Sequence, residues 1–477
     1  MILYTMQYIS TRDIQGEKCE FTDILLSGLA PEGGLYVPTH YPNITSQLAQ
    51  LRERSYSELA FYIIRLFVGA SIPAPDLDTI IKKTYHPSVF GSEEITPVTH
   101  LSDQIYIQDL SSGPSLAFKD LAMQFLGHVM DYTLKQQGKP LTIVGASSGD
   151  TVSAAEEAMR GKRQIKVVML TPKTGMSPFQ KAQAGSILDD NIFNVSIPGP
   201  FDICQDLVKA LNRDVLFKND HHIGAVNSIN WGRICAQVVY YFKGYFSVTS
   251  DNSEPVDVVV PSGNFGNVLA GYVAKQMGLP IRRLIVATNE NQVLDVFLKT
   301  GSYKQRDIIV TSSPSMDISK ASNIERLFFD LLDRKPDILS ETMAEFETTK
   351  SVDLSHLYPK LRDDLGFISG RSTHNERRDV IKSVYRQFNY IIDPHTASAV
   401  KVAQDYHDQS KIPMICMETA KPTKFESAVE EAIGFVPNRP KGFNGLEDRE
   451  QRFYEIDASI EALKAFIKEN ISNEMAG

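Results

Sequence analysis

The stretch VVVPSGNFGNVLAGY, from Val258 to Tyr272, joins a short apolar run to a glycine-containing loop. A continuous Val-rich run is typical of a strand that is buried on both faces. Gly263 and Gly266 let the chain turn sharply and let its backbone approach another molecule closely. The residues beyond Gly266 are expected to form a helix. The stretch therefore predicts a strand, a loop and a helix of a parallel α/β sheet.

The same alternation of strand-like and helix-like runs extends beyond this stretch. From about residue 141, runs rich in Val and Ile alternate with helix-like runs, as in LTIV before VSAAEEAM. This alternation predicts a parallel α/β architecture. Residues 301–385 interrupt it; they are mostly polar and helical, and we expect an insertion or a cap there. The pattern resumes at IPMICMET, and IDASIEALKAFIKENI predicts an amphipathic C-terminal helix.

The first hundred residues are expected to be helical and rich in loops. SYSELAFYIIRLFVGA begins with Ser and Glu capping residues, and APDLDTIIKKTY is a second predicted helix. The most apolar run, Leu59 to Ala70, is too short to span a bilayer and contains Arg65. We interpret it as a buried helix.

Composition narrows the class of protein. The chain has 477 residues, of which 42% are hydrophobic, and a net charge of -9. It is long enough for several domains with sizeable cores. The negative charge and the absence of a long basic run argue against a nucleic-acid partner.

The cysteines and the N-terminus bear on the compartment. Cys19, Cys204, Cys235 and Cys416 are widely spaced and form no CxxC pair, which is typical of buried thiols in a reducing compartment. MILYTMQYIS has no basic region and no long apolar core, so we predict no signal peptide. These features indicate a cytoplasmic protein without a membrane segment.

The opening loop admits two interpretations. Its N–H groups, together with those of the helix start, favour a phosphate. The alternative is a plain tight turn with an asparagine in the left-handed conformation. The loop is neither a Walker loop nor a GxGxxG motif. Its residues are Gly263, Asn264, Phe265, Gly266 and Asn267.

Two other loops end in helix starts with many hydrogen-bonding groups. TIVGASSGDTVSAAEEA offers hydroxyls and amides to a carboxylate, or is an ordinary helix cap. AVNSINWGRI could form an oxyanion clamp with bidentate Arg233, or a helix start with a surface arginine. His395 and the pair His221–His222 are expected to be turn or packed histidines, since no metal-ligand spacing accompanies them. We propose no metal.

Lys119, in SSGPSLAFKDLAMQF, stands at a predicted helix start after a Gly-Pro turn. Such a lysine is usually solvated. It can also be an amine that forms a Schiff base with a cofactor.

Taken together and in order, these motifs resemble those of threonine synthases, which are pyridoxal-phosphate enzymes. GPSLAFKD is similar to the lysine motif of the family, and PSGNFGNVLAGYVAKQMGLPI to its cofactor-phosphate loop. YISTRD with FTDILLSGLAPEGGLYVP, GASSGDT, VNSINWGRI, SPSMDISKASNIERL and DPHTA are further similarities. The long insertion resembles the larger bacterial and fungal type.

The resemblance implies a tryptophan-synthase-β-like fold of class α/β. Two parallel-sheet α/β domains would flank a cleft, with an N-terminal helical cap at 1–99. The smaller domain would span 100–245 with the lysine and the substrate loop. The larger cofactor domain would span 246–477, with a helical insertion at about 301–385.

The resemblance also implies residue roles. Lys119 would be catalytic and would hold pyridoxal 5′-phosphate as a Schiff base. Thr419, in METAKPTKF, would sit by the pyridine nitrogen and Asp150 near the 3′-oxygen. The cofactor phosphate would be bound by Gly263, Asn264, Phe265, Gly266 and Asn267. The substrate would be bound by Ser147, Ser148, Thr151, Lys181, Asn227, Ser228 and Arg233.

The implied reaction converts O-phospho-L-homoserine and water into L-threonine and phosphate, the final step of threonine biosynthesis, by a lyase that is a monomer or small homo-oligomer. Two departures from the family are Ser115, where Thr is usual, and Val152, where Gly is usual. A dehydratase or phospholyase of the same fold is the nearest alternative. A non-catalytic relative is a second alternative, although such proteins typically lose the lysine.

Overall fold

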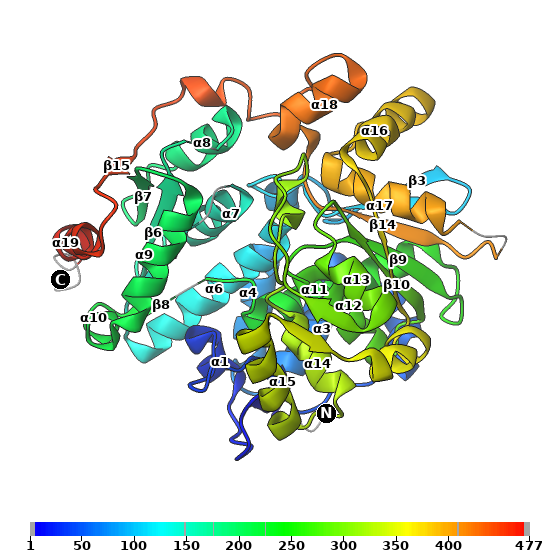
Figure 1. The fold of residues 1–477 in the computed structure, drawn as a ribbon, viewed down its shortest axis with the longest axis horizontal. Coiled ribbons are helices and arrows are strands. Elements are labelled where there is room, and N and C mark those ends of the chain that lie inside the picture. The colour runs from blue at the N-terminus through cyan, green and yellow to red at the C-terminus, as the bar shows by residue number, and fades with distance from the viewer. Residues whose placement is uncertain (1–4, 147–148, 175, 225, 408–409, 472–477) are drawn as a thin grey trace. The chain divides into compact units, whose positions relative to one another are not determined.

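The computed structural model describes residues 5–146, 149–174, 176–224, 226–407 and 410–471. The chain forms two compact units. The first contains residues 1–121 and 228–438, and the second contains residues 122–227 and 439–477. Both are built around a mostly or wholly parallel sheet (Figure 1), so the predicted α/β class with parallel sheets is confirmed.

The first unit contains a six-stranded sheet in the order β13-β10-β9-β14-β4-β3. Only β3 runs antiparallel to its neighbour. The strands are β3 (Val98–Ser102), β4 (Ile105–Asp109), β9 (Val256–Pro261), β10 (Ile281–Thr288), β13 (Phe367–Arg371) and β14 (Met414–Glu418). All residues of β9 and β14 are buried, as expected of central parallel strands.

The first unit also contains helices. They are α1 (Phe21–Ser27), α2 (Leu48–Arg52), α3 (Tyr56–Val68), α4 (Ala74–Thr84), α5 (Pro87–Phe90), α11 (Trp231–Val248), α12 (Gly266–Gln276), α13 (Val293–Thr300), α14 (Ile324–Leu331), α15 (Pro336–Thr349), α16 (His374–Phe388), α17 (Pro394–Asp405) and α18 (Glu426–Ile433). Of these, α11, α12, α13 and α17 contact the six-stranded sheet, and they are labelled in Figure 1. The predicted N-terminal helices are confirmed, because α3 begins with a Ser55–Glu58 capping box and buries Leu59 and Ile63 completely.

Two short antiparallel ladders complete the first unit. They are formed by β1 (Tyr8–Ser10) with β2 (Tyr36–Pro38) and by β11 (Ser302–Lys304) with β12 (Ser351–Asp353). The segment 301–385, expected to be a helical insertion, also contains the edge strand β13. Its sequence, FISGR, hides the strand because an edge position tolerates the exposed Arg371.

The second unit contains a five-stranded parallel sheet in the order β15-β7-β6-β5-β8. The strands are β5 (Leu141–Ala146), β6 (Ile165–Pro172), β7 (Ile192–Ile197), β8 (Ile223–Gly224) and β15 (Tyr454–Glu455). Its helices are α7 (Asp150–Met159), α8 (Pro178–Gly185), α9 (Phe201–Arg213), α10 (Val215–Asp220) and α19 (Ile460–Ile471). Helix α6 (Lys119–Gln137) begins in the first unit and continues in the second.

The boundaries of these units differ from those of the three segments expected from the sequence, which were 1–99, 100–245 and 246–477. Strand β4 pairs with β14, which places residues 105–109 in the sheet of the first unit. Strand β15 and helix α19 return to the second unit (Figure 1). Helix α19 buries Leu463 and Ile467 in the core of that unit. Both assignments depend on pairing between segments more than 250 residues apart, which local patterns do not reveal.

No helix among the described residues is long and apolar enough to cross a bilayer.

Candidate active site

One edge of the first unit's sheet gathers three of the predicted segments. Strands β9, β14 and β4 are neighbours and run parallel, so their carboxyl ends meet at this edge. The loop 262–265 follows β9, Thr419 follows β14, and the segment that leads to Lys119 follows β4. Ligands of open parallel sheets bind at such an edge.

The loop after β9 turns into α12 through a strained residue. Phe265 adopts the left-handed conformation, with φ of 65°. This corrects the alternative in which an asparagine of the loop would be left-handed. The conformation costs a residue with a Cβ about 1–2 kcal/mol. Burial of the Phe265 ring, whose centroid is 5.8 Å from that of Phe367, offsets this cost.

Gly263 is required by close backbone packing. A Cβ at this position would lie 2.4 Å from the carbonyl oxygen of Ser315. His395 holds Ser315 in place, because its Nε2 accepts a 3.1 Å hydrogen bond from the Ser315 N–H and its Nδ1 lies 2.7 Å from Asp393 Oδ1. This geometry assigns the proton to Nδ1. His395 is therefore a packed histidine, as predicted, and it supports the loop.

Two buried donors remain unmatched near the start of α12. Asn267 Oδ1 accepts from the hydroxyls of Tyr240 (2.6 Å) and Tyr241 (2.8 Å), while its Nδ2 has no partner in the described parts of the chain. Arg233 Nε likewise has none there. Burial lowers the pKa of Arg233 to about 10, although Tyr240 opposes the shift. Unmatched buried donors of this kind suit an anion.

A network joins Ser228 to the loop through residues that the sequence analysis did not single out. Asn323 Nδ2 donates to the carbonyl oxygens of Ser228 and Asn264, both at 3.1 Å. Arg326 donates to Asn323 Oδ1 at 2.6 Å and to two backbone carbonyls. The Ser228 hydroxyl lies 2.8 Å from that of Ser322. The sequence indicates this network only through the three-residue spacing of Asn323 and Arg326 in SPSMDISKASNIERL, a spacing that brings two side chains together on a helix.

Lys119 and Thr419 are brought together by backbone hydrogen bonds. The N–H of Phe118 donates to the Thr419 carbonyl at 2.9 Å, and the N–H of Lys421 donates to the Leu116 carbonyl at 3.0 Å. Lys119 is the first residue of α6 and is half-buried, and Thr419 is buried. The amine and the hydroxyl thus belong to directly paired segments.

The segment before Lys119 is also strained and tightly held. Leu116 has a φ of 59°. Ser115 is fully buried; its N–H donates to Asp120 Oδ2 at 2.8 Å, and its carbonyl accepts from Lys424 Nζ at 2.7 Å. The Ser115 hydroxyl, the first departure from the family, has no hydrogen-bond partner among the residues that the structure describes.

Further predicted residues belong to the second unit. Ser147 and Ser148 lie outside the described residues. Asp150 is the first residue of α7, and Gln180 Nε2 donates to it at 3.3 Å. Thr151 follows it and is partly exposed. Val152, the second departure from the family, is fully buried.

Two further predicted substrate residues are at least partly exposed. Lys181, in α8, is exposed, and its Nζ lies 5.4 Å from the centre of the Phe453 ring. Asn227 is partly exposed and is the last residue of the second unit's first segment.

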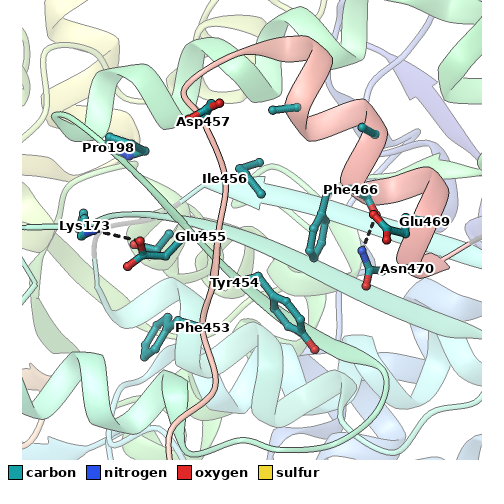
Figure 2. Close-up of a pocket in the computed structure, with 13 residues that line it drawn as sticks. Lys173, Pro198, Phe453, Tyr454, Glu455, Ile456, Asp457, Phe466, Glu469 and Asn470 are labelled. Atoms are coloured by element: carbon teal, nitrogen blue, oxygen red, sulfur yellow. Dashed lines mark hydrogen bonds and ion pairs between the residues drawn. The ribbon is translucent and has the colours of Figure 1, made fainter.

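A cavity of about 910 Å³ in the second unit is formed by residues around β15 and α19 (Figure 2). Lys173 and Glu455 form a 3.0 Å ion pair beside it. None of the predicted site residues lines this cavity, so we assign it no part in the reaction.

Family models match most of the chain. The model described as pyridoxal-phosphate dependent enzyme matches residues 89–352. Together with the lysine at the sheet edge, this match defines the class: the chain is an enzyme that depends on pyridoxal phosphate. Models of the threonine synthase N terminus and C-terminal region match residues 7–85 and 396–467.

Individual relatives agree. The chain is 50% identical to threonine synthase from Methylobacillus glycogenes, over 98% of this chain and 100% of that one. Its structure is similar to that of PLP-bound threonine synthase from Brucella melitensis, with a TM-score of 0.93, 39% identity, and coverage of 98% and 99%. For yeast threonine synthase the TM-score is 0.91, at 38% identity and the same coverage. The chain belongs to the threonine synthase family.

The site suits the cofactor of this family. A half-buried amine, a glycine-dependent loop at a helix start and a buried hydroxyl stand at one sheet edge. These are the kinds of group that an aldehyde, a phosphate and a ring nitrogen such as those of pyridoxal phosphate require, and Asn267 Nδ2, which has no hydrogen-bond partner in the described residues, adds a donor beside the loop.

Proposed function

We propose that this chain catalyses the conversion of O-phospho-L-homoserine and water into L-threonine and phosphate, as the last step of threonine biosynthesis. One observation carries the assignment of the site: Lys119 is paired through its backbone neighbours with Thr419, at the sheet edge that also bears the loop 263–267. The family membership supports the reaction.

Each cofactor-binding residue has a separate task. Lys119 would hold pyridoxal phosphate through a Schiff base, and the Thr419 hydroxyl would bind its ring nitrogen. Asp150 is assigned to the 3′-oxygen. The loop amides would bind the phosphate; the loop residues are Gly263, Asn264, Phe265, Gly266 and Asn267. When bound, pyridoxal phosphate supplies an electron sink for the carbanion chemistry.

The chain's own groups handle the substrate and its protons. The Lys119 amine removes the α-proton and shuttles protons in later steps. The substrate carries a carboxylate and a phosphate, and both need donors. Buried Arg233 is well suited to a phosphate because its guanidinium is bidentate and lacks a partner at Nε among the described residues. The remaining substrate contacts are assigned to Ser147, Ser148, Thr151, Lys181, Asn227 and Ser228.

We also propose a cytoplasmic monomer or small homo-oligomer that binds no nucleic acid. The net charge of -9 and the four scattered cysteines support this proposal.

The test is a product assay with purified protein, cofactor and O-phospho-L-homoserine. Threonine and phosphate in equal amounts are expected. Formation of 2-ketobutyrate and phosphate without threonine would overturn the proposal in favour of a dehydratase or phospholyase of the same fold.

A further inference from the structure

A cluster of buried charged side chains lies next to the paired segments of Lys119 and Thr419, at the ends of β4 and β14. Asp109 ends β4, Glu418 ends β14, and the two are register partners in the parallel ladder. Two carboxylates side by side on neighbouring strands would repel each other. Lys421 Nζ lies 2.7 Å from Asp109 Oδ2 and 2.7 Å from Glu418 Oε1, so one ammonium bridges both.

Hydroxyl groups complete the cluster. Ser111 Oγ lies 3.0 Å from Asp109 Oδ1 and 3.1 Å from Glu418 Oε1, so the two carboxylates share its one proton. The hydroxyls of Ser112 and Tyr390 donate to Asp109 and Glu418 respectively. Only 2% of the Glu418 side chain is exposed. Burial raises the pKa of Glu418 to about 7, and Lys421 opposes the rise. Burial also works against the Asp109 carboxylate, but Lys421 and the hydrogen bonds from Ser112 and Ser111 together lower its pKa.

The cluster fixes the course of the backbone on both sides. Leu110 N–H donates to the Glu418 carbonyl at 3.1 Å. The next bonds along the two segments are those from Phe118 to Thr419 and from Lys421 to Leu116. Lys421 therefore binds the partner segment twice, through its ammonium at Asp109 and through its amide at Leu116.

The strained Leu116 shows why such fixation is needed. A left-handed leucine persists only where its surroundings enforce the conformation. Here the Lys421 amide holds the Leu116 carbonyl, and the Lys424 ammonium holds that of Ser115. This strained turn sets the direction in which the chain enters α6 at Lys119.

We propose that Lys421 is a positioning residue: its ammonium, held between Asp109 and Glu418, sets the placement of the Lys119 amine relative to the Thr419 hydroxyl. The proposal rests on the roles of Lys119 and Thr419 in the proposed function. Lys421 itself touches neither cofactor nor substrate in it.

The test compares Lys421→Met and Lys421→Arg in the cofactor-loaded enzyme at about pH 8, where Glu418, with a pKa of about 7, is ionised. Lys299→Met is the matched control, because Lys299 forms a 2.8 Å ion pair with the buried carboxylate of Asp295 away from this edge. Visible circular dichroism per bound cofactor reports the cofactor's orientation. Steady-state kinetics separate kcat from KM.

We expect Lys421→Met to alter the visible dichroism band and to lower kcat about 10- to 100-fold, with KM little changed. Lys421→Arg should recover most of both signals, since a guanidinium can bridge two carboxylates. Lys299→Met should leave both unchanged. A Lys421→Met enzyme with the wild-type band and kcat would overturn the proposal, even if its melting temperature falls.

Glu418→Gln keeps the proposal testable if Lys421→Met does not fold or does not retain cofactor. The amide keeps the size of the carboxylate: its oxygen can accept from Ser111 and its NH2 group can donate to the Tyr390 oxygen, and it removes one of the two charges that hold the ammonium. A smaller change of band and kcat in the same direction is expected, and no change would overturn the proposal. Failure of the proposed function is distinguishable, because the wild-type enzyme would then make no threonine or its visible band would survive Lys119→Ala.

Discussion

Two non-glycine residues, Phe265 and Leu116, have a positive φ and lie on the two segments that define the candidate site. Each conformation is unfavourable by itself. Phe265 is stabilised by burial of its ring, and Leu116 by the hydrogen bonds around it. Backbone strain that the surroundings enforce is typical of sites that must hold a fixed geometry. Both segments to which the chemistry is assigned thus contain such a residue, as do several other parts of the chain.

At the same scale, we predict that Lys119→Ala abolishes the covalent attachment of cofactor. Turnover should fall by about 10²- to 10⁴-fold or more, because the proton shuttle is lost. The measurements are threonine formation and the visible absorption band. Lys135→Ala is the control, since Lys135 lies in the same helix, is exposed and pairs with Asp131 at 2.7 Å. Undiminished turnover in Lys119→Ala would rule out the assigned role.

At the scale of the element, the strand–loop–helix unit of β9 and α12 depends on different features at its two glycines. Gly263 lies against the Ser315 backbone, which His395 and Asp393 hold in place. At Gly266 the nearest atom to an added Cβ, Asn323 Nδ2, is 3.4 Å away, an ordinary contact. The loop therefore tolerates a methyl group at one glycine and not at the other.

Accordingly, Gly263→Ala should destabilise the cofactor-free protein by about 1–3 kcal/mol, because the backbone must shift to relieve the clash. Gly266→Ala should leave stability unchanged or raise it slightly, because it reduces the freedom of the unfolded chain. Thermal unfolding of the two variants beside the wild type gives the comparison. Equal melting temperatures for the two variants would contradict this account of the loop.

The pairing of β4 with β14 predicts a dependence of stability on pH. Burial raises the pKa of Glu418 from its ordinary value of 4.5 to about 7, so the folded state binds this proton more tightly than the unfolded state. The resulting stabilisation is fully present below about pH 4.5 and is lost as the pH rises through about 7. Asp109, whose pKa is lowered from 3.8, titrates below this window.

Glu418→Gln should remove this contribution. The decline of the unfolding free energy over the same pH range should then become shallower, by at most about 3 kcal/mol. Denaturant unfolding at a series of pH values measures it, with the exposed Glu345→Gln as control. Parallel curves for the wild type and Glu418→Gln would show that the buried carboxyl does not titrate in this window.

At the scale of the whole molecule, each unit is assembled from segments far apart in the chain. The second unit has a core to which β5, β6, β7 and α9 contribute, and α19 completes it with Leu463, Phe466 and Ile467. Lys464 of α19 forms an ion pair with Asp214, the N-cap residue of α10. Integrity of this unit therefore depends on the C-terminal helix.

We predict that Leu463→Ala destabilises the second unit by about 2–5 kcal/mol, because it opens a cavity in a fully buried position. Hydrogen exchange should show faster exchange in residues 122–227, with residues 228–438 unaffected. The exposed Glu461→Ala provides the control. Faster exchange spread evenly over both units would argue against a separate core.

Local patterns in the sequence determined the elements that have strong periodicity or caps. Strand β5 includes the predicted run LTIV, and helix α3 lies within the predicted run SYSELAFYIIRLFVGA, because apolar period and capping residues are local signals. The motifs likewise determined the family and the cofactor. Strand β13 was hidden, since an edge strand needs no continuous apolar run.

Tertiary structure alone decided which segments meet. The register of Asp109 with Glu418, the bridge by Lys421 and the support of Gly263 through Ser315 and His395 all join residues separated by tens to hundreds of positions. Sequence periodicity reports only a residue's own element. Pairing two distant strands, or placing a counter-ion beside a buried charge, lowers the free energy through contacts between elements. These contacts form only in the folded chain, so the sequence pattern of a single element does not predict them.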